Sequence, residues 1–254
     1  MSDLEAMGLT VPGLEIEVDT RSFFRQGRKM GLGSSAAATV ILASLMYAFS
    51  GDAVEHDTRK SRQEIAEIAV RAHRHAQGKR GSGYDILTSC YGSLGVFTGG
   101  EHPQWRHLRD DHPIFNLHSY SFPGPEEVDS REAVKKYHDW KIQSPGKSGQ
   151  FFHDSQTLMK RMEESSSEDE VLRLITELRM LYTELGEVIG VGSWISPPSP
   201  FYEKSAWKGS GAGNELGLLF LSRSSRLELD APYESLTPDH EGLRLFSSRG
   251  DAIL

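Results

Sequence analysis

The chain has 254 residues, of which 37% are hydrophobic and 25% are charged, a balance typical of a globular protein with a substantial core. The net charge of −8 argues against a general nucleic-acid-binding protein, which needs a basic surface to replace counterions. It leaves room for a local site that binds a small anion.

Hydrophobic periodicity predicts five elements in the first part of the chain. In chain order they are a strand over 14–18, a helix over 34–49, a helix over 61–78, a helix over 84–91 and a strand over 94–98. Ser61 and Glu64 form a capping-box pattern at the start of the second helix. The longest apolar run, 36–49, is shorter than the about 20 residues that span a bilayer, so we expect no membrane segment.

The second part of the chain is predicted to contain both strands and helices. The predicted elements are strands over 105–108 and 114–120, helices over 151–162 and 170–188, a strand over 216–221 and a strand over 243–247. Acidic residues 168–170 suit the N-terminus of the second helix. The Pro-containing acidic stretch 123–131 is a candidate boundary, which predicts domains over 1–125 and 126–254.

The first motif is Gly31-Leu32-Gly33-Ser34-Ser35-Ala36-Ala37, at the start of a predicted helix. Small residues let a ligand approach the backbone, and N–H groups at a helix N-terminus favour an anion. Two hydroxyls add donors, and one can also ligate Mg²⁺. The turn therefore predicts phosphate binding, with a plain loop and a serine N-cap as the alternative.

Two rival motifs do not fit their required context. The pattern Gly31-x-Gly33-x-x-Ala36 matches a dinucleotide fingerprint, but the polar residues 25–29 before it do not form the required buried strand. Pro145-Gly146-Lys147-Ser148 resembles the end of a Walker A loop, but Lys141 stands where the first glycine is needed. We reject both.

The second motif is Gln77-Gly78-Lys79-Arg80-Gly81-Ser82-Gly83-Tyr84-Asp85. Its cations can hold phosphate oxygens, and its carboxylate can accept a proton from a substrate hydroxyl or orient it. A helix N-cap is the alternative role for Asp85. The third motif, Lys208-Gly209-Ser210-Gly211-Ala212-Gly213-Asn214, forms either a ligand-wrapping loop or a simple hairpin turn.

The remaining candidates receive structural interpretations. His73 and His75 lie on different faces of a helix, so we interpret them as solvated or capping residues rather than metal ligands. Cys90 is the only cysteine, which excludes an internal disulfide and fits a reducing, cytoplasmic location. We interpret its thiol as buried and inert.

The three motifs, in this order, resemble those of the GHMP kinases and most closely those of the phosphomevalonate kinase branch. Residues 29–37 resemble the central ATP-binding motif, and the preceding 19–24 resemble the lead-in of that branch. Residues 73–89 resemble the second signature, and 206–213 resemble the C-terminal glycine motif. The resemblance covers residues 19–220.

The resemblance implies a two-domain α+β fold, with an N-terminal domain like domain 2 of ribosomal protein S5 and a ferredoxin-like C-terminal domain. It implies that residues 31–37 bind ATP, that Ser35 contacts Mg²⁺ through ATP, and that Asp85 faces the acceptor as base or orienter. The implied substrate and phosphate ligands are Lys79, Ser82, Gly83, Lys208, Ser210, Gly211, Ala212 and Gly213.

The implied activity is ATP-dependent phosphorylation of a small anionic metabolite, with phosphomevalonate converted to diphosphomevalonate. The first family motif is absent, which predicts a truncated N-terminal domain and a missing segment that another chain could supply. Asn214-Glu215-Leu216 also departs from the third motif. The alternative is a truncated or degenerate homologue that binds nucleotide or a partner without catalysis.

Overall fold

The structure is a computed structural model, and it describes residues 15–25, 28–49, 58–76, 81–125, 130–192, 195–197, 203–210, 215–225 and 233–245. The chain divides into two compact units, the first made of Met1–His107 with Pro238–Leu254 and the second of Leu108–Thr237. Both contain helices and antiparallel strands, so the predicted α+β class is confirmed. The division into an N-terminal kinase domain over 1–125 and a C-terminal domain over 126–254 stays a prediction.

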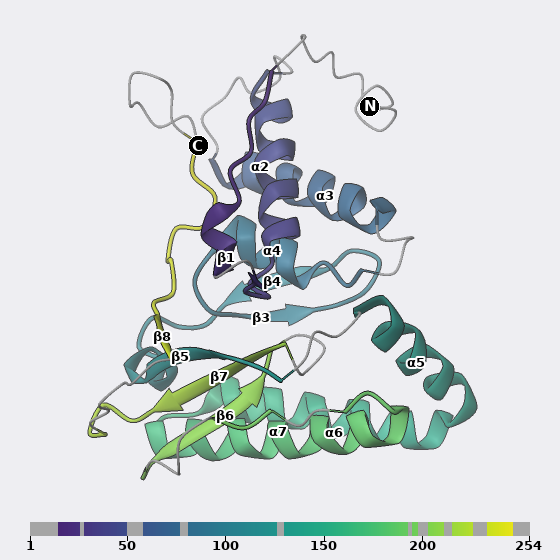
Figure 1. Ribbon diagram of the computed structural model, residues 1–254, viewed down its shortest axis with the longest axis vertical. Coiled ribbons are helices and arrows are strands. Elements are labelled where there is room, and N and C mark those ends of the chain that lie inside the picture. Colours follow the sequence, from purple (N-terminus) through teal and green to yellow (C-terminus); the bar gives the residue numbers. More distant parts are fainter. Residues whose placement is uncertain are drawn as a thin grey trace. The chain divides into compact units, whose positions relative to one another are not determined.

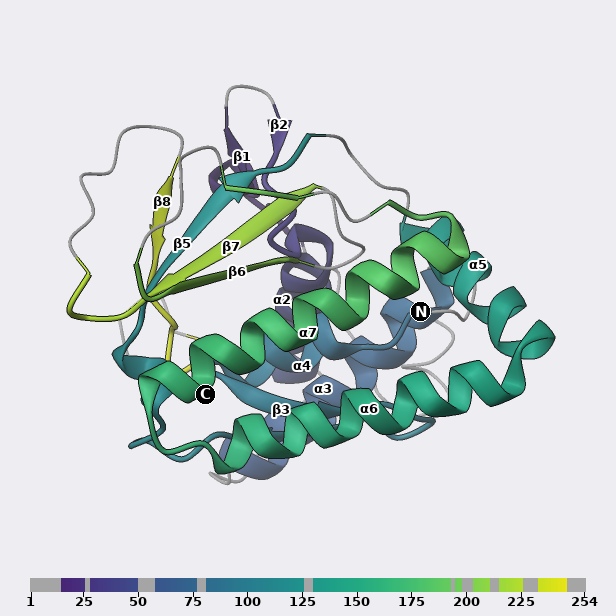
Figure 2. The same ribbon diagram turned by 90° about the horizontal axis from the view of Figure 1, so that it is seen from below.

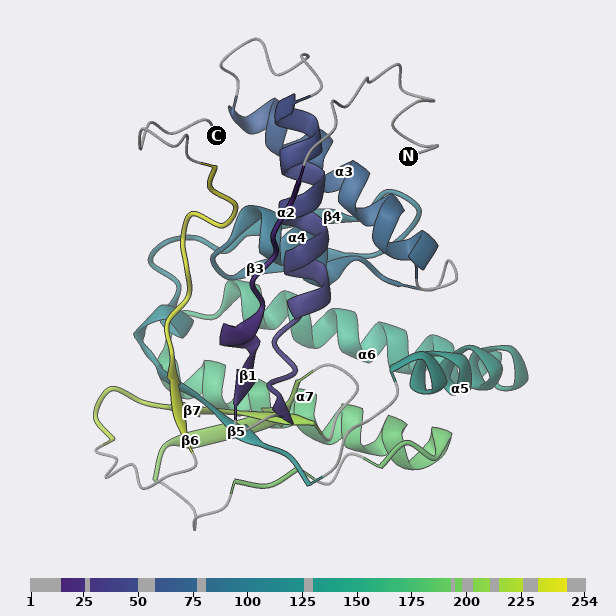
Figure 3. The same cartoon turned by 45° about the horizontal axis from the view of Figure 1, so that its top comes forward.

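Three helices form the core of the first unit. They are α2 (Ser34–Phe49), α3 (Thr58–Ala76) and α4 (Tyr84–Tyr91), and each packs against the other two (Figure 1, Figure 3). The unit also contains η1 (Arg21–Phe23), the antiparallel pair β1 (Phe24–Arg25) and β2 (Arg28–Lys29), and the antiparallel pair β3 (Gly95–Thr98) and β4 (Gln104–His107).

Helix α2 is built by the small and apolar residues of its sequence. Ala36, Val40, Ala43 and Tyr47 recur at helical spacing and are buried in the core of the unit. The bounds predicted for α2 and α4 are confirmed, because both helices carry their periodic signal within their own sequence.

Two predictions in the first unit are wrong. Residues 15–20 form no strand, although their sequence alternates, and Leu14 lies outside the described residues. Helix α3 begins at Thr58, so Ser61 and Glu64 lie inside it and form no capping box. The carboxylate of Glu64 instead accepts a hydrogen bond from the hydroxyl of Tyr47 on α2, a contact between helices that local spacing does not encode.

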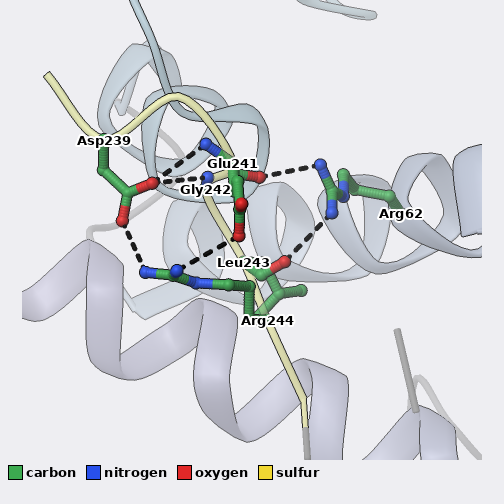
Figure 4. Close-up of polar contacts among 6 residues, drawn as sticks. All are labelled: Arg62, Asp239, Glu241, Gly242, Leu243 and Arg244. Atoms are coloured by element: carbon green, nitrogen blue, oxygen red, sulfur yellow. Dashed lines mark hydrogen bonds and ion pairs between the residues drawn. The ribbon is translucent and has the colours of Figure 1, made fainter. Parts of the chain in front are cut away.

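The chain returns to the first unit after the second, through a C-terminal strap formed by residues 238–244 (Figure 4). The guanidinium of Arg62 on α3 donates to the carbonyl oxygens of Glu241 and Leu243, at 2.9 and 3.1 Å. Leu243 joins the hydrophobic core, and its N–H donates to the carbonyl of Cys90. Residues 243–245 form no strand, which corrects the predicted final strand over 243–247.

The second unit consists of an antiparallel sheet and three helices (Figure 2). Its elements are η2 (Pro113–Asn116), β5 (His118–Pro123), α5 (Ser130–Gln143), α6 (Pro145–Glu164), α7 (Glu168–Ile189), β6 (Ser205–Gly209), β7 (Leu216–Leu221) and β8 (Glu234–Leu236). The strand order is β6-β7-β5-β8, with every neighbouring pair antiparallel.

The sheet of the second unit separates two hydrophobic clusters. On β7, Phe220 contacts the cluster built mainly from α7, whereas Leu219 and Leu221 belong to the cluster on the other face with Phe122 of β5. This alternation follows from the two-residue period of a strand. The acidic first turn predicted for the long helix is confirmed, and the Ser167 hydroxyl caps it by accepting from the N–H of Glu170.

Three features of the second unit differ from the prediction. Residues 114–116 belong to the short helix η2, so the predicted strand over 114–120 is wrong in its first half. Helix α5 was not predicted, because its sequence is mostly polar and its exposed face carries little periodic signal. Helix α6 begins at Pro145, so the rejected Walker-like segment is simply its first turn, where the Ser148 hydroxyl donates to the Pro145 carbonyl.

Among the helices that the structure describes, none is both long and apolar enough to cross a bilayer.

Candidate functional site

The glycine–serine turn, residues 31–37, leads directly into α2. Gly31 and Gly33 have φ values of 66° and 76°, in the left-handed region that favours glycine. A Cβ built on Gly33 would meet no atom within 4 Å, so the backbone is open on that side. Since the first turn of α2 contains no acidic residue, its N–H groups and helix dipole are left to attract an anion.

The two serines of this turn face different surroundings. Ser34 is buried, with 7% of its surface exposed, whereas Ser35 is exposed. Ser35 is therefore the hydroxyl that a bound phosphate can reach. Its Oγ lies 3.1 Å from Nε2 of His73 on α3.

His73 corrects the interpretation of the histidine pair. It is buried, with 4% of its surface exposed, and it contacts the predicted phosphate turn, so it is not a solvated residue. His75 is exposed, as expected for the other face of the helix. A sequence signal for this burial exists, because Ile65 and Ala69 precede His73 by eight and four residues, at helical spacing, but it does not identify Ser35 as the contact.

The second predicted segment, residues 81–85, leads into α4. Gly83 is the N-cap residue of this helix, with φ at 91°, and a Cβ there would lie 3.3 Å from the side chain of Val70. Asp85 is therefore not the N-cap. It lies in the first turn, half-buried, and its Oδ1 accepts a hydrogen bond of 3.0 Å from the N–H of Ile86.

Arg74 ties this second segment to the end of α3, a role that the sequence analysis missed. Its guanidinium donates to the carbonyl oxygens of Gly81 and Ser82 at 3.0 and 2.9 Å. It also donates to the carbonyls of Gly100 and Glu101 at 2.8 and 2.9 Å. Consecutive residues of α3, His73 and Arg74, thus contact the two predicted site segments of the first unit.

The third predicted segment belongs to the second unit. Lys208 lies in β6, and burial lowers the pKa of its ammonium group. The N–H of Ser210 donates to the carbonyl of Leu216, so the segment connects the antiparallel neighbours β6 and β7. Lys79, Gly211, Ala212 and Gly213 lie outside the described residues.

The donor set of the turn fits Mg²⁺ held through a nucleotide. Among the described residues, no group of three or more His, Cys, Asp or Glu side chains could hold a metal ion. The exposed Ser35 hydroxyl offers one oxygen ligand. Because Mg²⁺ usually keeps several waters and binds protein groups together with substrate phosphates, a single hydroxyl suits an ion that arrives with ATP.

A cavity of about 670 Å³ lies within the first unit. Its walls include Ala66 and Val70 of α3, Leu87 of α4, and Val96 and Trp105 of the β3–β4 hairpin. None of the predicted site residues that the structure describes lines it. The predicted site is therefore defined by its loops and helix ends rather than by this cavity.

Sequence comparison finds relatives for the segment that contains both loops. Residues 2–93 match the family model of the GHMP kinases N-terminal domain. The phosphomevalonate kinase of Gibberella zeae is 45% identical over 67 residues, which cover 26% of this chain and 15% of that protein. The phosphomevalonate kinase of Saccharolobus solfataricus is 39% identical over 84 residues, which cover 32% and 24%. The matches thus span less than a quarter of these relatives.

Structure comparison extends the similarity to both units. The Lin0012 protein from Listeria innocua has a TM-score of 0.70 at 20% identity, over 93% of this chain and 76% of that one. The L. major mevalonate kinase has a TM-score of 0.52 at 14% identity, over 76% and 57%. Residues 2–93 therefore match the GHMP kinases N-terminal domain, and the α+β fold of the chain is similar to that of a mevalonate kinase.

Proposed function

We propose that this chain is a small-molecule kinase that transfers the γ-phosphoryl group of ATP to an anionic metabolite, with phosphomevalonate as the acceptor. One observation carries the proposal. The end of α3 contacts both the Ser35 turn, which suits ATP phosphates and Mg²⁺, and the segment that leads to Asp85, which suits the acceptor. The phosphomevalonate kinases among its relatives support the choice of acceptor.

The chemistry requires positioning more than proton removal. A phosphate oxygen of the acceptor attacks the γ-phosphorus, the bond to the β-phosphate oxygen breaks, and ADP leaves. An acceptor phosphate is already ionised, so Asp85 serves to orient it rather than to remove a proton. Cations must offset the repulsion between the acceptor phosphate and the phosphates of ATP. Lys79, in the same predicted motif as Asp85, is our candidate for that role, and Lys208 of the second unit stays a predicted phosphate ligand. We expect the reaction to take place in the cytoplasm, with a small molecule as partner and no nucleic acid or membrane.

The decisive test combines binding with turnover. MgATP binding is measured by calorimetry, and ADP formation is measured with phosphomevalonate and, for comparison, mevalonate. Asp85→Asn should lower turnover about 100-fold while the Kd for MgATP stays within twofold, because the substitution changes the group that orients the acceptor and leaves the Ser35 turn intact. Asp139→Asn, an exposed change on α5, is the matched control and should leave both unchanged.

The outcomes separate the alternatives. Unchanged turnover in Asp85→Asn would remove this residue from the mechanism. MgATP binding without phosphate transfer to any acceptor would favour the non-catalytic homologue, which binds nucleotide or a partner. Tight NAD(P) binding without ATP binding would revive the dinucleotide interpretation of residues 31–36.

A further inference from the structure

His73 is a polar residue at the end of an otherwise apolar stripe of α3. Ile65 and Ala69, four and eight residues before it, are fully buried against α2 and α4, and the His73 ring continues this line with 4% exposure. Burying a polar ring costs free energy unless it is hydrogen-bonded, and an apolar residue would fit the stripe without that cost. The position therefore retains a polar group for a reason other than core packing.

The contact that the ring makes points to that reason. Its Nε2 lies 3.1 Å from Oγ of Ser35, which is 38 residues earlier in the chain and is itself exposed. A serine hydroxyl has three staggered rotamers, and an exposed one samples them freely. A hydrogen bond from a ring held inside the core selects one of them, whichever of the two groups donates the proton.

We propose that His73 is a positioning residue that fixes the Ser35 hydroxyl for the phosphate–Mg²⁺ group of the bound nucleotide. The proposal rests on the proposed function, because it assigns the nucleotide to the Ser35 turn. In this role His73 does not itself touch the nucleotide. It acts through Ser35 alone, so removing Ser35 must also remove the effect of His73.

The neighbouring Arg74 strengthens the argument for pre-organisation. Its four hydrogen bonds to loop carbonyls hold the end of α3 in place, which fixes the backbone from which the His73 ring extends. The ring therefore needs no rearrangement when the nucleotide binds. Organisation before binding lowers the entropic cost of association.

The test is a double-mutant cycle read by the Kd for MgATP. His73→Leu should weaken binding about 3- to 10-fold, the range expected for one hydrogen bond and one freed rotor. In a Ser35→Ala background the same change should have an effect smaller than twofold. His75→Gln, on the exposed side of the same helix turn, should bind MgATP as the unsubstituted chain does.

A second pair of variants keeps the test valid if His73→Leu does not fold. The Gln amide reaches the position of Nε2, whereas the shorter Asn amide reaches only that of Nδ1. The Kd of His73→Gln for MgATP should therefore stay within twofold of that of the unsubstituted chain, and His73→Asn should bind MgATP about 3- to 10-fold more weakly.

The results that contradict the inference are distinct from those that contradict the proposed function. An equal loss from His73→Leu with and without Ser35 would show that the residue acts through packing, and equal affinities of the Gln and Asn variants would also overturn the proposal. If the unsubstituted chain binds no MgATP, both the proposed function and this inference fail.

Discussion

Gly242, in the C-terminal strap, is the position where one added methyl group should have the largest predictable effect. Its φ is 69°, and a Cβ there would lie 2.5 Å from the nitrogen of Gly92 and 2.6 Å from the carbonyl oxygen of Cys90. Both are backbone atoms at the end of α4, so neither can rotate away. Gly242→Ala should therefore displace the strap from the first unit.

The expected cost has two parts. Holding alanine in the left-handed region costs about 1–2 kcal/mol. Displacing the strap exposes Leu243, which is 7% exposed, and the loss of a buried leucine costs about 1.5–3 kcal/mol. The sum is about 2.5–5 kcal/mol, and the carbonyls bound by Arg62 are released as well.

Gly190 provides the matched control. It follows α7 with a φ of 66°, nearly the same as that of Gly242, but a Cβ there would meet nothing within 4 Å. Gly190→Ala should therefore pay only the backbone cost of about 1–2 kcal/mol. The difference between the destabilisation of Gly242→Ala and that of Gly190→Ala measures the cost of the close contact between the strap and α4.

Hydrogen exchange read by mass spectrometry suits this test, because a chain with two units need not unfold in one step. In Gly242→Ala, protection should fall in peptides from α3 and α4 and remain in those from the sheet of the second unit. Gly190→Ala should change only peptides around the end of α7. Equal, small losses in the two variants would refute the reasoning, since they would show that α4 tolerates a methyl group against the strap.

Two further predictions concern the cores of the units. A Cβ on Gly217 would lie 2.1 Å from the ring of Phe122, which is 1% exposed, so Gly217→Ala should destabilise the second unit by about 1–3 kcal/mol in urea unfolding, and an unchanged midpoint would contradict this overpacking. Burial raises the pKa of the Cys90 thiol to about 12, so iodoacetamide should alkylate the folded chain at pH 8 far more slowly than the urea-unfolded chain. Equal alkylation rates in the two states would disprove the burial of this thiol. Because the raised pKa means that the thiol ionises at lower pH in the unfolded state than in the folded state, the free energy of unfolding should fall as pH rises from about 9 towards 12.

Local sequence determined the helices and strands whose apolar spacing and flanking glycines can be recognised within a short segment. Helices α2 and α4 and strand β7 have the bounds that periodicity predicts, because their apolar spacing and flanking glycines are read within each segment. The same local chemistry marked residues 31–37 as an anion site, since open glycines and a helix N-terminus are sequence features. Strand β6 and helix α5 were missed, because β6 is short and leads into a glycine-rich turn, and α5 is mostly polar.

The tertiary structure alone decided which residues meet. His73 and Ser35 are 38 residues apart, and Arg62 and Leu243 are 181 residues apart, so no spacing rule connects them. Periodicity says that a helix has a buried face but not which neighbour covers it, so the apolar row of Ile65 and Ala69 extends to His73 without revealing that Ser35 lies against its ring. The packing of α3 against α2 buried the His73 ring against Ser35, in the turn that is predicted to bind phosphate, and left His75 in solvent.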